Sequence, residues 1–295
     1  MRMLYDVSHR TSFHYAQPVR FQRCNLRLEP VRWSGQELEG YELTVTPRAA
    51  LTVMRPGGYP VNMVRMLLEQ ATTELVIESR FRMAVDRDVP EIRTDDASLG
   101  DVAAAVRASG DLSSTGPANY LFASPLIALE AEIAAWAAAE LDPRRGAVEA
   151  GLALATRIHD EFLYDGAATV ADTRPIEAFR GRHGVCQDFA QVMIAALRAH
   201  GLPAAYVSGY LRTIPPEGQP RLVGADATHA WVMLWCGPAR GWIGFDPTNA
   251  CLMAGDHIVT AVGRDYADVS PIDGIFMGQD QQSVDVAVDV EPVEA

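Results

Sequence analysis

The stretch GVCQDFAQVMIAALRAHG, residues 184–201, predicts the element around which the second half of the chain is organised. Its apolar residues recur at helical spacing and form one stripe that faces a core: Phe189, Val192, Met193, Ala196 and Leu197. Gly201 ends the helix. Cys186 therefore falls in the first helical turn, where the helix dipole and unpaired backbone N–H groups favour a thiolate.

On either side of this helix the hydrophobic periodicity changes. Residues 205–211, 230–235 and 242–245 alternate with period two and are predicted strands. Before the helix, residues 124–140 are predicted as a helix capped by Ser124 with Pro125 at its first position, and residues 147–162 as another. Helices followed by strands indicate an α+β core over residues 119–295.

The first part of the chain has a different pattern. Residues 1–85 alternate between apolar and polar positions, with prolines at the turns, and are predicted to form an all-β, sandwich-like domain. Residues 86–118 are acidic and rich in Gly, Ser and Pro, and we expect them to link the two domains. Residues 284–290 predict a final strand, which we assign to the second domain.

Composition excludes several classes of function. The 295 residues include 38 acidic and 25 basic ones, a formal charge of −13, and all the basic residues are arginine. This surface charge disfavours nucleic acid as a partner. No apolar run reaches the ~20 residues that span a bilayer, and the first residues lack a signal-peptide core, so we expect a cytoplasmic protein with no membrane partner.

The cysteines predict neither disulfides nor a metal centre. Cys24, Cys186, Cys236 and Cys251 are few and scattered, and no CxxC pair is present. We therefore expect four reduced thiols and no zinc site built on a CxxC pair.

Two downstream residues complete a candidate catalytic set with Cys186. His229 begins one predicted strand and Asp246 ends the next, and the turn-forming residues 236–241 join the two as a hairpin. If Trp235 pairs with Trp242, Asp246 becomes the diagonal neighbour of His229 on the same face, within side-chain reach. A nucleophile, a base and a carboxylate that orients the base are the groups that amide acyl transfer requires.

Five separated segments in this order resemble one family. They are Gly184-Val-Cys-Gln-Asp-Phe-Ala190, Val207-Ser-Gly-Tyr-Leu211, His229-Ala-Trp-Val232, residues 241–249 (GWIGFDPTN) and residues 263–271 (GRDYADVSP). The chain is similar here to the bacterial transglutaminase-like proteins, a branch of the papain-like cysteine enzymes. Residues 1–85 resemble the β domain that precedes the catalytic core in that group.

The resemblance implies a Cys-His-Asp triad at Cys186, His229 and Asp246, with no metal or organic cofactor. Two positions depart from the family pattern: members commonly carry an acidic residue at Met233 and often a histidine at Gln191. These departures put substrate recognition in question.

Other residues near these motifs have two readings. Tyr210, Trp231 and Trp242 either wall a substrate cleft or belong to the core. His183 lies near Cys186 in sequence and is an alternative base, although the sequence supplies it with no orienting carboxylate. Asn249 is either a turn residue or a support for the Asp246 loop.

Two functions fit these observations. The first is thiol-dependent amide hydrolysis or acyl transfer on peptide or protein substrates, through a thioester on Cys186; water as acceptor gives a protease or deamidase, and an amine gives a crosslinker. The second is a non-catalytic module that keeps the fold and binds a peptide or partner. The sequence leaves the physiological substrate and the oligomeric state undetermined.

Overall fold

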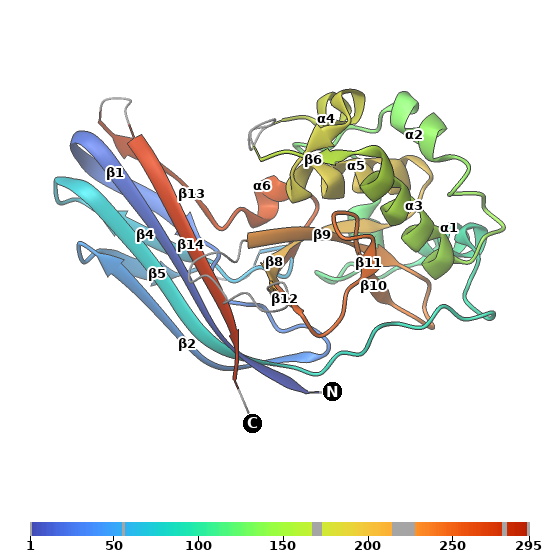
Figure 1. Ribbon diagram of the computed structural model, residues 1–295, viewed down its shortest axis with the longest axis horizontal. Helices are drawn as coiled ribbons and strands as arrows, with labels where there is room; N and C mark the ends of the chain where they lie inside the picture. Colours follow the sequence, from blue (N-terminus) through green and yellow to red (C-terminus); the bar gives the residue numbers. More distant parts are fainter. Residues whose placement is uncertain (1, 55–56, 167–172, 214–227, 279–281, 294–295) are drawn as a thin grey trace, which may run out of the picture.

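The computed structural model describes residues 2–54, 57–166, 173–213, 228–278 and 282–293. Two units lie side by side (Figure 1): one is built from long strands, and the other from helices that cover a five-stranded sheet. The predicted α+β class with an all-β amino-terminal part is confirmed. None of the helices in these residues is both long and apolar enough to cross a membrane.

One long strand, β1 (Met3–Leu26), is the spine of the strand-rich unit. Its first half pairs with β5, and its second half pairs with β4. The register shifts between the two halves, and Phe21 has a positive φ of 54°, as expected where a bulge bends a strand. The other strands of the amino-terminal sequence are β2 (Gln36–Thr46), β3 (Ala50–Val53), β4 (Val64–Leu68) and β5 (Thr72–Val85).

The last two strands return to β1. Strands β13 (Ile272–Met277) and β14 (Gln282–Pro292) both pair antiparallel with it, so the chain begins and ends in the same sheet, with its termini close together (Figure 1). The final strand was expected in the second domain and lies instead in the first. The physical reason is burial, because Val288 and Val290 pack in one cluster with residues of β1 and β5.

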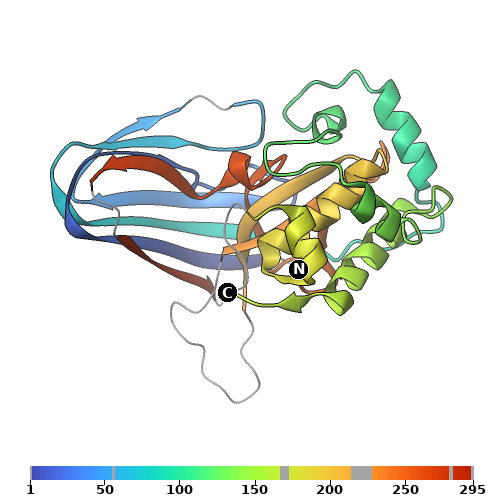
Figure 2. The same ribbon diagram turned by 90° about the horizontal axis from the view of Figure 1, so that it is seen from above.

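The second unit carries a sheet in the order β11-β10-β9-β8-β12, with helices packed against it (Figure 2). Its strands are β8 (Ala204–Leu211), β9 (Thr228–Trp235), β10 (Trp242–Asp246), β11 (Cys251–Leu252) and β12 (His257–Gly263). A separate parallel pair is formed by β6 (Leu163–Tyr164) and β7 (His183–Gly184). The helices are α1 (Leu99–Ala108), η1 (Pro117–Tyr120), α2 (Ala131–Ala137), α3 (Ala147–Glu161), α4 (Pro175–Gly181), α5 (Cys186–Ala199) and α6 (Tyr266–Val269).

The predicted helices are partly corrected. Helices α3 and α5 have the expected bounds within a residue or two, but the helix predicted over residues 124–140 is wrong, since only α2 forms there. Tertiary contacts override the local signal: the Leu126 N–H donates to the buried Asp265 carboxylate at 2.8 Å, and Ile127 is fully buried. The expected linker, residues 86–118, contains α1, whose apolar face joins the core of the second unit.

The strand-rich unit covers an open edge of the second sheet. Strand β12 is the outermost strand there, and its Val259 bonds to the Gln36 side chain as it would to a neighbouring strand: the Val259 N–H donates to Oε1 at 3.0 Å, and Nε2 donates to the Val259 carbonyl at 2.8 Å. The Val31 N–H donates to the next carbonyl, that of Thr260. These bonds satisfy edge groups that would otherwise remain open to pairing with other chains.

A buried histidine joins the two units. His9 of β1 lies 2.8 Å through Nδ1 from the Tyr210 hydroxyl of β8 and 3.1 Å through Nε2 from the Thr11 hydroxyl. Burial lowers the pKa of His9 to about 4. Among the residues that the structure describes, no charged partner offsets this burial, so the imidazole is neutral in the folded protein near pH 7.

His9 should make folding stability depend on pH. Because its pKa is lower in the folded than in the unfolded chain, its contribution is complete above about pH 6.5 and is lost as the pH falls towards 4. We expect the free energy of unfolding to lose up to about 3 kcal/mol from this group over that window. Urea unfolding of the wild type and of His9→Gln at several pH values measures it; equal pH dependence of the two proteins would contradict the assignment.

Candidate active site

Cys186 is held at the amino-terminal end of α5 by the residues just before it. The Asp188 carboxylate accepts the Val185 N–H at 2.8 Å and so fixes the start of the helix. Gly184 gives this carboxylate room, because a Cβ there would lie 2.6 Å from Asp188 Oδ2. Cys186 itself is half-buried, with its thiol at the positive end of the helix.

His229 and Asp246 come from neighbouring strands in the predicted register. Trp242 pairs with Trp235 and Phe245 with Val232, so Asp246 of β10 lies diagonally opposite His229 of β9 on the same face. On the other side of β9, His229 faces Gly209 of β8. A Cβ on Gly209 would lie 2.5 Å from the Trp231 ring, so glycine there lets this ring pack beside His229.

The structure joins His229 to Asp246 and places Cys186 near the same imidazole. His229 Nε2 lies 2.7 Å from Asp246 Oδ2. Hydrogen bonding with the Cys186 side chain and its charge contribute to the raised pKa of His229, and with Nε2 on the carboxylate, Nδ1 is the nitrogen left for the thiol. His229 is 9% exposed and Asp246 is fully buried, so this contact is largely shielded from water.

Asp246 is surrounded by donors. The Thr248 and Asn249 N–H groups donate to Oδ1 at 2.9 and 3.2 Å, and Asn249 Nδ2 donates to Oδ2 at 2.7 Å. Asn249 thus both closes the turn and supports the carboxylate. Burial alone would raise the pKa of Asp246, but the hydrogen bonds from His229, His257 and Asn249 hold it well below its ordinary value.

The Asp246 carboxylate in turn influences the pKa of the His229 imidazole. Burial alone would lower the pKa of His229, but the hydrogen bonds to Asp246 and Cys186 and their charges raise it to about 10. The imidazolium form is therefore stabilised at neutral pH. A protonated imidazole beside a cysteine is the arrangement that sustains a thiolate.

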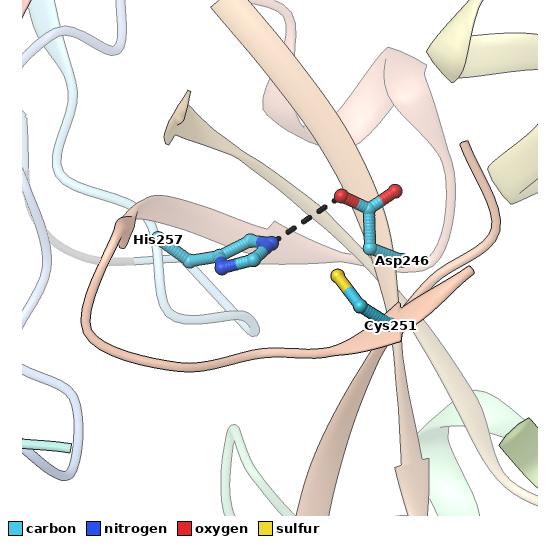
Figure 3. A group of neighbouring side chains, drawn as sticks. All are labelled: Asp246, Cys251 and His257. Atoms are coloured by element: carbon cyan, nitrogen blue, oxygen red, sulfur yellow. Dashed lines mark hydrogen bonds and ion pairs between the residues drawn. The ribbon is translucent and has the colours of Figure 1, made fainter. Parts of the chain in front are cut away.

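A second histidine, which the sequence did not single out, also lies on Asp246. Figure 3 shows His257 of β12 pointing at the carboxylate, with Nε2 3.3 Å from Oδ2. Its Nδ1 accepts the Ala254 N–H at 3.4 Å, so Nε2 carries the proton and donates. No local pattern predicts this role, because His257 lies 11 residues from Asp246 and reaches it only when β12 folds back along β8.

The same close-up contains a group with metal-ligand chemistry. Asp246, Cys251 and His257 each offer one ligand atom, and these atoms lie within 4.8 Å of one another. The sequence predicted no such group, because its cysteines are scattered along the chain. It forms because Cys251 of β11 pairs directly with Asp246 across a tight turn.

Comparison with known proteins agrees with this fold and its order of motifs. Residues 5–84 match the bacterial transglutaminase-like N-terminal region, and residues 130–247 match the core of the transglutaminase-like superfamily. An uncharacterised protein of Mycobacterium tuberculosis (strain H37Rv) is 37% identical over 294 residues, 98% of this chain and 93% of that protein. The chain belongs to the transglutaminase-like superfamily.

Two further relatives are informative. A solved structure from Cytophaga hutchinsonii, described as a "Putative Cysteine Protease", superposes over 100% of this chain and 92% of its own with a TM-score of 0.79 at 20% identity, which shows a shared fold. A protein-glutamine gamma-glutamyltransferase of Pseudomonas aeruginosa is 40% identical over 93 residues, 30% of this chain and 14% of that protein.

The three aromatic residues considered as cleft walls differ in burial. Trp231 is fully buried, stacks beside His229 at 6.0 Å between ring centroids and donates to Met253 Sδ. Tyr210 is buried against the strand-rich unit. Trp242, at the far end of β10 from Asp246, is half-buried and donates to the Thr115 carbonyl. Trp231 and Tyr210 are thus core residues, and substrate contact by any of the three stays a prediction.

An aromatic residue from another segment lies beside the thiol. Tyr164 of β6 is 57% exposed, and burial together with the nearby Cys186 raises its pKa. It packs on Phe189 of α5 and reaches the site because β6 runs parallel to β7, directly before the cysteine. His183, the alternative base, has no carboxylate partner in the described part of the chain, and its Nδ1 is buried without a hydrogen bond there.

The two departures from the family pattern lie in the core. Met233 is fully buried in a cluster with Trp231 and Val259. Gln191 is fully buried in α5, and neither atom of its amide has a hydrogen-bond partner among the described residues. Neither residue is exposed where a substrate could touch it.

Replacing Asp246 should lower the raised pKa of His229. In Asp246→Asn the charge is removed while the burial remains, so we expect the pKa of His229 to fall from about 10 to its ordinary 6.5 or below. NMR titration of ¹⁵N-labelled histidine side chains measures this change, with the exposed His14 as internal control. A His229 that still titrates near 10 in the variant would contradict the electrostatic account.

Proposed function

We propose that this protein is a thiol-dependent enzyme that cleaves amide bonds in peptide or protein substrates and passes the acyl group to water or to an amine. Cys186 is the nucleophile, His229 the general base and acid, and Asp246 the group that orients the imidazole. The 2.7 Å contact between the buried His229 imidazole and the Asp246 carboxylate, with Cys186 close enough to contribute to the raised pKa of His229, supports the proposal.

The first half of the reaction forms a thioester. The Cys186 thiolate attacks the amide carbonyl carbon, and a backbone N–H of the first helical turn of α5 is the proposed donor to the oxyanion that develops. The C–N bond then breaks, and the His229 imidazolium gives its proton to the leaving amine. Asp246 keeps the ring in position and stabilises its charged form.

The second half of the reaction releases the acyl group from Cys186. His229, now neutral, takes a proton from water or an amine, which attacks the thioester carbonyl; the C–S bond breaks and the thiolate is restored. The proton that His229 gives to the leaving amine is replaced by the one that it takes from the acceptor. The names of the relatives, a glutamyltransferase and a cysteine protease, support this reaction class and both acceptors.

Alkylation of the four cysteines tests the nucleophile. Burial raises the pKa of Cys24 and of Cys251 to about 11 and raises that of Cys236 still further. We expect iodoacetamide to modify Cys186 at least about tenfold faster than these three, and to do so even at pH 6, because the imidazolium sustains the thiolate. Peptide mapping by mass spectrometry locates the label.

The matched control for this experiment is Asp246→Asn. It leaves the thiol in place and removes the carboxylate that stabilises the imidazolium, so Cys186 labelling at pH 6 should slow. Equal and sluggish modification of all four thiols in the wild type would favour a non-catalytic peptide-binding module.

Amide turnover separates the two acceptors. Incubating a glutamine-containing peptide with and without a primary amine gives products of different mass for hydrolysis and transamidation. The chain contains no lysine, so side-chain amines of the enzyme cannot act as acceptors and self-crosslinking does not confuse the masses. Cys186→Ala should abolish turnover, and Asp246→Asn should lower kcat by about 10²–10⁴-fold through a misoriented imidazole. Undiminished turnover by Cys186→Ala would end the proposal.

A further inference from the structure

Two side chains beside the Asp246 carboxylate, Cys251 and His257, have no assigned step in the reaction above. Cys251 and His257 approach Asp246 from two different segments: Cys251 from the strand paired with it and His257 from the start of β12 (Figure 3). Asp246 is fully buried, His257 is 4% exposed and Cys251 is half-buried. A small ion therefore reaches this cluster from the side on which Cys251 lies.

The three ligand atoms are the kinds that zinc-like ions select. A thiolate, an imidazole nitrogen and a carboxylate oxygen together suit Zn²⁺ and its thiophilic analogue Cd²⁺, and they disfavour Mg²⁺ and Ca²⁺, which prefer oxygen alone. Ligand atoms on a tetrahedral zinc ion lie ~3.5 Å apart, because its bonds are about 2.0–2.3 Å long. His257 Nε2 and Asp246 Oδ2 are already 3.3 Å apart, and all three atoms lie within 4.8 Å.

We propose that Asp246, Cys251 and His257 form a binding site for a thiophilic divalent cation of the zinc class, and that the bound ion inhibits the enzyme. The inhibitory part rests on the proposed function, whereas the binding part does not. This ion is a regulator that competes with the triad, and the reaction needs no metal.

Inhibition follows from the number of groups that share one oxygen. Oδ2 of Asp246 serves His229 at 2.7 Å, Asn249 at 2.7 Å and His257 at 3.3 Å. A cation on this oxygen uses the lone pair that orients His229 and neutralises the charge that stabilises its imidazolium. The base then loses both its position and its electrostatic support.

Proton balance defines what binding changes. Asp246 is already ionised, and Cys251 gives up its thiol proton to become a ligand. His257 stays neutral but exchanges tautomers: Nε2 releases its proton to bind the ion, and Nδ1 takes one up. This exchange breaks the hydrogen bond from the Ala254 N–H to Nδ1, which is long at 3.4 Å.

Cadmium titration tests the site without reference to activity. The probe is Cd²⁺ added to Cys186→Ala, a background without the triad thiol, and the readout is the ultraviolet thiolate-to-cadmium charge-transfer band. We expect one equivalent to produce the band, and we expect the band to be lost in Cys186→Ala/Cys251→Ser. A band that persists without Cys251, or no band in the first protein, would overturn the site.

A second comparison distinguishes the loss of a metal ligand from damage to the fold. Cys251→Ala should melt close to the wild type, since the thiol is half-buried and makes no hydrogen bond to the described residues. Cys236→Ser is the matched control for loss of a different thiol. If Cys236→Ser in the same background also loses the band, the cluster is not its source. Retention of the band in that control supports the assignment to Cys251.

Activity measurements then test regulation. A thiolate nucleophile is itself a zinc ligand, so the comparison is between wild type and Cys251→Ser. We expect the zinc concentration for half inhibition to rise by about tenfold or more in the variant, a loss of one ligand from the site. Equal sensitivity would overturn the regulatory role. Should neither protein turn over any amide, the proposed function fails while the cadmium titration still decides the site.

Discussion

The buried carboxylate of Asp246 is the constraint on which the rest of this structure depends. A charge removed from water is costly unless it is surrounded by donors, and here two backbone N–H groups, an amide and two imidazoles surround it. Those donors come from β9, from the turn after β10 and from β12. The fold must therefore bring three segments together before the charge is tolerated, and the same contacts stabilise the charged form of His229.

The strand-rich unit contributes to this arrangement although it supplies none of the three triad residues. It covers the edge of β12, the strand that begins with His257, through the Gln36 amide and the Val31 N–H. The carboxy-terminal strand then returns to β1, so the second unit is enclosed in sequence between two parts of the first. We infer that the two units stabilise each other, since the interface buries His9 and Tyr210 in contact.

The amino-terminal end of α5 combines two properties that the proposed reaction would use. It fixes the start of the helix that carries Cys186 through the Asp188 bond to Val185, and it directs N–H groups and the positive end of a dipole towards the thiol. Tyr164 adds an exposed aromatic side chain from β6.

The sequence by itself determined the α+β class, the bounds of α5, the β9–β10 register and the pairing of His229 with Asp246. Each of these follows from local chemistry: helical periodicity, a turn of fixed length and motifs a few residues long. Only the tertiary structure decided that residues 124–130 are not helical, that β14 joins β1, that Trp231 is buried, and that Cys251 and His257 meet at Asp246. These outcomes depend on contacts between segments far apart in the chain, where a buried hydrogen bond or apolar contact outweighs local propensity and no short pattern records the partner.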